Sequence, residues 1–219
     1  MQLEAVMQRL ESQGTEQARK IYRRHCTNTS AFGTSFADMR KLAKEIKRDH
    51  ALALELWATG IFEARVVATM IADPGQLTAE AAEAWVGEMT GHPLTDELVN
   101  NLLVKTPYAG EKAVAWVDSP LEFVGRAGWH LVAVSAKAGR DTLDYTGLLA
   151  QIEREIHSAP NRKREAMNNA LMAIGIYRRD LSEAAIAAAE RIGPVDIDHG
   201  ETSCKTPLAT EYIRKALSR

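Results

Sequence analysis

Several features that would assign a protein class are scarce or absent in this chain of 219 residues. Its two cysteines, Cys26 and Cys204, are too few for a disulfide framework and favour a reducing, cytoplasmic setting. No apolar run approaches the length needed to span a bilayer. Residues 1–14 place acids on an amphipathic pattern, which is typical of a helix rather than of a signal peptide. We therefore expect a cytoplasmic protein without a membrane segment.

Linkers and strand patterns are equally scarce. Glycine, proline and serine never gather into a low-complexity tract, so we expect one continuous domain over residues 1–219. Apolar residues almost never alternate with a period of two, and the short stretch VDID at residues 195–198 is the one strand candidate. Apolar residues at helical spacing recur instead along the whole chain. This pattern predicts an all-α fold.

Tryptophans indicate how the helices are arranged. Trp57, Trp85 and Trp116 each lie near the end of an amphipathic stretch and are 28 and 31 residues apart. These intervals are typical of helix-pair repeats. We expect HEAT- or ARM-like helix pairs stacked into a curved superhelix, an α-solenoid, whose long concave surface binds something extended.

Charge is distributed unevenly, although the formal net charge is only −2. Residues 1–48 carry a net +5, residues 49–100 a net −8, and residues 161–219 a net +2. The basic residues either form solvated helix faces or form a stripe that faces phosphate groups, while the near-neutral total argues against strong nonspecific binding of nucleic acid. The candidate contacts to a DNA backbone are Arg19, Arg23, Arg40, Lys44, Arg162, Lys163 and Arg164.

Three polar features stand out from the helical pattern. Arg126 interrupts the apolar segment EFVGRAGWHLVAVSA, where a buried charge needs a partner such as Glu122 or else a ligand. Asp96 lies in the first turn of a predicted helix, where an acid ordinarily interacts with the helix dipole. Asn168 and Asn169 stand in mid-helix despite their low helix propensity. Each feature serves packing and capping or lines a binding groove.

The segment at residues 194–207, PVDIDHGETSCKTP, gathers acids with His199 and Cys204. It lacks the paired ligand spacings of a metal site, so we expect no metal. A nucleophilic Cys204 with His199 as its base is an alternative, although the pair is unspecific. No phosphate-binding loop or dinucleotide fingerprint occurs, so we expect no cofactor. We interpret the segment as a structured loop that packs across the last repeat.

Five segments together resemble one known family. They are FGTSFADMRKLAKEI, LWATGIFEARVVATMIADP, TDELVNNLL, FVGRAGWHLVA and KREAMNNALMAIG. They are similar to the bacterial DNA alkylation repair glycosylases of the AlkD type, and the resemblance runs roughly from the first helix to Gly193. It implies HEAT-like helical repeats, double-stranded DNA as the partner, excision of cationic N3- or N7-alkylated purines, and no metal.

The resemblance also assigns roles to individual residues. Asp96 falls at the family's essential aspartate, whose carboxylate stabilises oxocarbenium-like charge and holds the attacking water. Arg126 matches an arginine that positions a phosphate group, so these two are the candidate catalytic residues. Tyr22 matches an aromatic residue near the lesion. His92 and Asn169 stand where the family has two tryptophans that contact the substrate.

The two replacements remove aromatic faces that would stabilise a cationic lesion. Trp129 shares a helix face with Arg126 and is a candidate substitute. The sequence therefore predicts a DNA-binding relative of the glycosylases, with excision resting on Asp96. The alternative from another class is a noncatalytic scaffold that binds a protein or nucleic acid in its groove, and the acidic middle of the chain favours a protein. Salt-sensitive binding would distinguish DNA from a protein partner.

Overall fold

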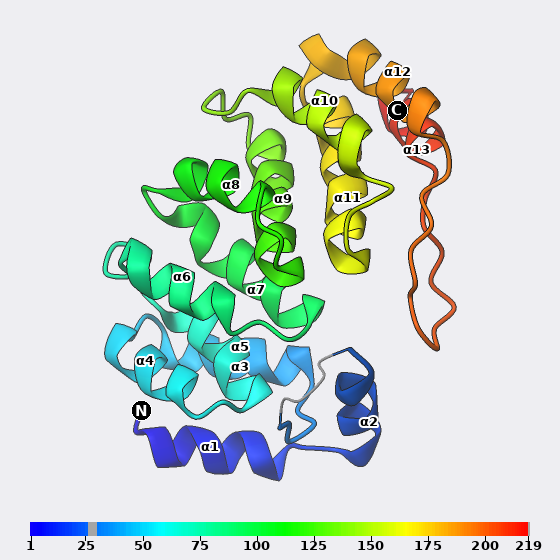
Figure 1. Cartoon of the computed structure of the whole chain (residues 1–219). Coiled ribbons are helices and arrows are strands. Elements are labelled where there is room, and N and C mark those ends of the chain that lie inside the picture. The colour runs from blue at the N-terminus through cyan, green and yellow to red at the C-terminus, as the bar shows by residue number, and fades with distance from the viewer. Residues whose placement is uncertain (26–29, 219) are drawn as a thin grey trace. The chain divides into compact units, whose positions relative to one another are not determined.

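The computed structural model describes residues 1–25 and 30–218, and the predicted all-α fold is confirmed within them (Figure 1). Cys26 lies outside the described residues, and Cys204 is a free, exposed thiol. The strand candidate at residues 195–198 forms no strand, because the backbone of Asp196 and Asp198 bonds to side chains of residues 161–177 instead. None of the described helices is long and apolar enough to cross a membrane.

The chain divides into two compact units, Met1–Pro107 and Tyr108–Arg219, and each is described by itself. The prediction of one domain over the whole chain stays a prediction. The described helices of unit 1 are α1 (Leu3–Ser12), α2 (Glu16–His25), α3 (Phe36–Ile46), α4 (His50–Ala58), α5 (Phe62–Ile71), α6 (Ala79–Gly87), α7 (His92–Asn101) and the short η1 (Leu103–Lys105). Those of unit 2 are α8 (Ala109–Val117), α9 (Glu122–Lys137), α10 (Tyr145–Glu155), α11 (Asn161–Tyr177), η2 (Arg179–Leu181), α12 (Ser182–Ile192) and α13 (Ala209–Leu217).

Helix α5 forms the centre of unit 1 and packs against α3, α4 and α7. Its apolar side chains, Val66 and Ile71 among them, are fully buried. Side-chain caps define where neighbouring helices begin: Ser35, Asp49 and Thr78 accept the backbone N–H groups at the starts of α3, α4 and α6. Such caps contribute about 1 kcal/mol each, because they satisfy donors that a helix leaves free.

Two of the tryptophans that mark the repeat spacing meet in unit 1. The rings of Trp57 on α4 and Trp85 on α6 are parallel, with centroids 3.9 Å apart. The guanidinium of Arg65 lies 4.9 Å from the centre of the Trp57 ring. The regular interval in the sequence therefore corresponds to equivalent positions on the first helices of successive pairs, which stack through these side chains.

A buried carboxylate fixes the loop before α3. Glu63 on α5 is fully buried, and its two oxygens accept the backbone N–H groups of Phe32, Gly33 and Thr34 at 3.0, 2.6 and 3.2 Å. Gly33 has φ +90°, and a Cβ there would lie 2.2 Å from the carbonyl oxygen of Thr15. The loop therefore needs both a glycine and the acceptor from α5 to hold its position.

Helices α9 and α11 form the centre of unit 2, with α8 against α9 and α13 against α11. Small residues permit close approach: a Cβ at Gly128 on α9 would lie 2.6 Å from the backbone nitrogen of Val117 on α8. Trp129, the next residue along α9, is fully buried. The apolar character of α9, read from its sequence, therefore corresponds to a core helix.

Candidate nucleic-acid interface

A basic groove lies on unit 1, between α3, α5 and α7. It is a cavity of about 400 Å³ lined by Arg40, Ala43, Lys44, Lys47, Arg48, Met70 and Asn101. Arg40 and Lys44 lie one turn apart on the same face of α3, and Lys47 and Arg48 follow in the turn after the helix. The predicted basic stripe of α3 therefore borders a concave surface rather than only a solvated face.

Two of the four cations in the basic groove are held by acids and two are not. Arg40 pairs with Glu97 at 2.9 Å, and Arg48 pairs with Asp73 at 3.4 Å. Asp73 has a pKa below its usual value, mainly because the side chain of Gln76 and then the backbone of Gly75 donate hydrogen bonds to it. Lys44 and Lys47 are exposed and form no ion pair with any described residue. The groove therefore keeps a positive charge that suits an anion.

Lys47 adopts an unusual backbone conformation at the end of α3. It has φ +66° and ψ −149°, and it is the one described non-glycine residue with a positive φ. This region of conformational space is occupied almost only by glycine, and other residues there cost about 1–3 kcal/mol. Its N–H donates to the carbonyl of Ala43, and the N–H of Asp49 donates to Ile71 at 2.9 Å, which pins the turn. A strained lysine thus presents its ammonium at the basic groove.

Asp96 and His92 lie one turn apart at the start of α7. His92 is the first residue of this helix, and its ring meets the ring of His25 edge-to-face, with centroids 5.1 Å apart. Both His92 and Asp96 are partly exposed. The sequence gives no local signal for His25, because 67 residues separate it from His92. The site of the predicted catalytic carboxylate therefore presents imidazole rings where the family pattern has an indole.

Two aromatic residues that were expected near the substrate belong to the core instead. Tyr22 is 7% exposed, packs on Phe36 and Phe62, and donates its hydroxyl hydrogen bond to the carbonyl of Thr34 at 2.6 Å. Trp129 is fully buried. Their apolar surroundings explain these positions, and neither ring lies on a surface that a nucleobase would reach.

Arg126 is neutralised inside unit 2. Its side chain is 4% exposed, and Nη1 donates to the carboxylate of Glu165 at 2.7 Å and to the carbonyl of Arg162 at 3.0 Å. Glu122, the expected partner, accepts the backbone N–H of Arg162 at 2.6 Å and so caps α11. A phosphate contact through Arg126 would require Glu165 to give up this pairing.

The basic run at residues 162–164 makes internal bonds as well. Arg162 pairs with Glu165 at 3.2 Å, and Arg164 donates to the carbonyls of Ala159 and Asp196 at 2.8 Å each. Lys163 is 7% exposed; its ammonium donates to the carbonyl of Ser119 at 2.9 Å, and burial lowers its pKa. Unlike Lys44 and Lys47 of the basic groove, these three side chains all form bonds within the protein.

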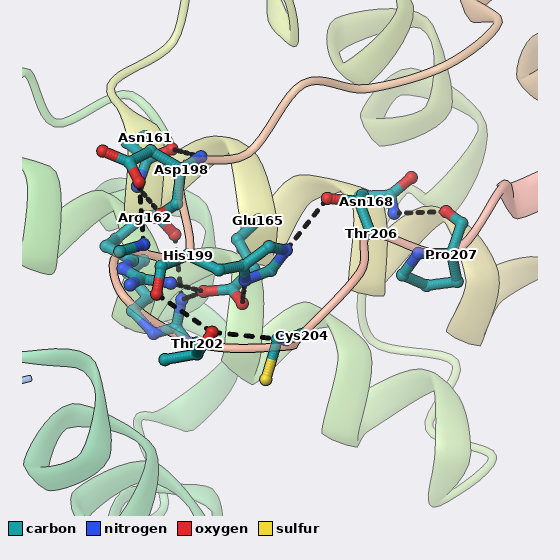
Figure 2. A network of polar contacts seen from close by, with 12 residues as sticks. Asn161, Arg162, Glu165, Asn168, Asp198, His199, Thr202, Cys204, Thr206 and Pro207 are labelled. Carbon is teal, nitrogen blue, oxygen red and sulfur yellow. Dashed lines mark hydrogen bonds and ion pairs between the residues drawn. The ribbon is translucent and has the colours of Figure 1, made fainter. Parts of the chain in front are cut away.

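Polar contacts hold the segment between α12 and α13 against α11 (Figure 2). Asn161 exchanges two hydrogen bonds with the backbone of Asp198, both at 2.8 Å. His199 contacts the Thr206 hydroxyl at 3.0 Å and the Glu165 carboxylate at 3.8 Å. The amide of Asn168 donates to the carbonyl of Pro207 at 3.2 Å. The predicted packing of this loop across the last repeat thus has a physical basis.

The same contacts bear on the alternative chemistry of the segment. His199 is engaged by Thr206 and Glu165, and the backbone N–H of Cys204 donates to Thr202 at 3.3 Å. No hydrogen bond joins His199 to Cys204 in the described part of the chain. Within that part, no group of three or more histidine, cysteine or acidic residues is placed to hold a metal ion.

Asn169 borders a second cavity, which we call the tyrosine cavity. Its volume is about 450 Å³, and it lies between α11 and α13 within unit 2. Two half-exposed tyrosines, Tyr177 and Tyr212, border it. The tyrosine cavity is lined by Asn169, Met172, Ala173, Ile176, Tyr177, Tyr212, Lys215 and Ala216. Sequence reasoning singled out Asn169 and missed the tyrosines, although Tyr177 follows Asn169 at helical spacing, i+8.

Comparison with known proteins relates the whole chain to one family. A family model described as DNA alkylation repair enzyme matches residues 6–213. Uncharacterized proteins of Listeria innocua and Listeria monocytogenes are 30% and 29% identical to this chain, over 100% of its length and 97% of theirs. One solved structure represents a new family of proteins related to the HEAT-like repeat DNA glycosylases with affinity for branched DNA structures.

That structure matches all of this chain and 94% of its own, with a TM-score of 0.89 and 29% identity. The predicted HEAT-like helical-repeat fold is therefore confirmed. The helices of this chain also agree with the helix pairs that the tryptophan interval indicated, since Trp57, Trp85 and Trp116 lie on α4, α6 and α8.

Proposed function

The chain belongs to the DNA alkylation repair enzyme family, and from this we propose that it binds DNA through the basic groove of unit 1. The observation that carries the proposal is the pair of exposed lysines, Lys44 and Lys47, which stand beside Arg40 and Arg48 without acidic partners of their own. Phosphate contacts of this kind position a protein on nucleic acid without reading its sequence.

We further propose that branched DNA is the preferred form. The support is the similarity to a structure whose family has affinity for branched DNA. The near-neutral charge of this chain agrees with selective binding, because a weakly charged protein gains little from long-range attraction to any duplex. Local contacts in grooves then decide which DNA shape is bound.

Fluorescence anisotropy tests the proposal with a labelled three-way junction and a paired duplex of the same length. We expect the junction to bind more tightly and both affinities to fall as salt rises from roughly 50 to 200 mM, because phosphate contacts release counterions. Binding of neither DNA, or affinity independent of salt, would refute the proposal. That result would move the alternative, a scaffold for a protein partner, to first place.

Hydrolysis of the N-glycosidic bond is the second candidate function. The observation in its favour is the partly exposed Asp96 in the first turns of α7, which matches the family's carboxylate. In the proposed roles, Asp96 stabilises the sugar cation and Arg126 positions a phosphate once Glu165 releases it. His92 and Asn169 supply no indole face for a cationic purine at the two matched positions.

We therefore expect no release of 7-methylguanine or 3-methyladenine from alkylated DNA above that of Asp96→Asn, measured by chromatography of the free bases. The Asp96→Asn change keeps the shape of the side chain and removes its charge. Anisotropy on the same samples shows that both proteins bind the substrate. Release by the unmodified protein that Asp96→Asn abolishes would contradict this expectation and establish glycosylase activity.

A further inference from the structure

The tyrosine cavity combines an apolar floor with polar groups that have no internal partners. Met172, Ala173 and Ile176 from α11 form the floor, and Met172 is 7% exposed. The side chains of Asn169 and Lys215 form no hydrogen bond or ion pair with any described residue. An apolar surface bordered by a few convergent polar groups is typical of a small-ligand site.

The two tyrosines make this cavity suitable for a flat aromatic ligand. Tyr177 is 46% exposed and Tyr212 is 51% exposed. They come from different helices, α11 and α13, and their rings contact neither each other nor another described ring. Each tyrosine ring therefore has one face that no neighbouring side chain covers. Any of the four nucleobases can stack on such rings, because every base has a π face.

We propose that the tyrosine cavity receives an unpaired nucleobase of branched DNA, an inference that rests on the proposed function. The base stacks on Tyr177 and Tyr212, the amide of Asn169 bonds to its edge, and the ammonium of Lys215 contacts the adjoining phosphate. A cavity of about 450 Å³ is large enough for a base with its sugar. A fully paired duplex offers no free base, so this cavity favours branch points and bulges.

The polar groups match this ligand in kind. The amide of Asn169 is both a donor and an acceptor, so it suits any of the four bases. Lys215 has no acidic partner among the described residues and provides one cation for one phosphate. A membrane surface or an acidic peptide would use the cation but would leave the two aromatic faces and the amide without a role.

Photo-crosslinking tests the position of the base in the unmodified protein. A duplex with one unpaired 5-iodouracil is irradiated in the complex, and the crosslinked peptide is identified by mass spectrometry. We expect attachment at Tyr177 or Tyr212, because iodouracil reacts with the aromatic ring on which it stacks. Attachment only at residues outside the tyrosine cavity would overturn the inference.

Binding by the double variant Tyr177→Ala/Tyr212→Ala tests the energetics. We expect its affinity for the bulged duplex to fall by about 10- to 100-fold and its affinity for the paired duplex to stay within about twofold. The variant Tyr177→Phe/Tyr212→Phe keeps the rings and is expected to bind both like the unmodified protein. Val114→Ala/Leu121→Ala removes apolar side chains that are 53% and 62% exposed elsewhere in unit 2, and serves as the matched control.

The outcomes separate this inference from the proposed function. If the unmodified protein binds both DNAs in a salt-sensitive manner but the alanine variant weakens neither or weakens both equally, the inference fails and DNA binding stands. If the unmodified protein binds no DNA, both fail. Thermal unfolding of each variant monitors the fold, and the crosslink remains decisive if the alanine variant does not fold.

Discussion

Replacement of both Lys44 and Lys47 by glutamine is expected to weaken DNA binding by about 30-fold near physiological salt. Each ammonium that contacts a phosphate releases about 0.9 counterion, so removing two lowers the slope of log affinity against log salt by about 2. Neither lysine has an ion pair within the described chain, so the change breaks no internal contact. Anisotropy titrations at several salt concentrations measure both quantities.

The control for this variant carries the same change in net charge. Lys20 on α2 and Lys41 on α3 are also exposed but do not line the basic groove. We expect Lys20→Gln/Lys41→Gln to change the salt slope by less than about 0.5. An equal loss in the two double variants would mean that overall charge, rather than the groove, attracts DNA, and the proposed interface would be abandoned.

Replacement of Glu63 by glutamine is expected to lower the free energy of unfolding by about 1–3 kcal/mol. The carboxylate is fully buried and accepts three backbone N–H groups of the loop before α3. Glutamine directs an NH₂ group toward some of these donors, and a buried donor left without an acceptor costs about 1–3 kcal/mol. Urea unfolding monitored by circular dichroism measures the loss.

Glu55 on α4 provides the matched control, because it is exposed and makes no contact of this kind. We expect Glu55→Gln to change stability by less than about 0.5 kcal/mol. A Glu63→Gln protein as stable as the unmodified chain would show that the loop holds its position without this acceptor. In that case the ordering of α2 and α3 in unit 1 would need another explanation.

Local signals in the sequence predict much of the fold. Apolar residues at helical spacing identify the helices, because this pattern depends only on residues a few positions apart. The basic stripe of α3 was also visible, since the helical repeat alone sets which side chains share a face. The tryptophan interval identified the helix pairs, because a repeated unit places the same residue type at a regular interval in the sequence.

Partners that are distant in the sequence were not predictable in this way. Arg126 was assigned to Glu122 or to a ligand, whereas its carboxylate partner is Glu165, which is 39 residues away. Trp129 was expected at a groove, yet a ring in an apolar helix is equally compatible with a core position, and this ring is fully buried. Sequence spacing determines which residues share a face but not what covers that face.

At Lys47, the residue that would best stabilise the backbone differs from the residue that gives the basic groove its charge. A glycine at this turn would relieve the strain of the positive φ. A search for more thermostable variants of the protein would therefore favour Lys47→Gly. The same replacement would delete one of the two unpaired ammonium groups of the basic groove. Engineering for heat resistance alone would therefore select a protein that withstands higher temperature but lacks one of the two lysines proposed to contact DNA.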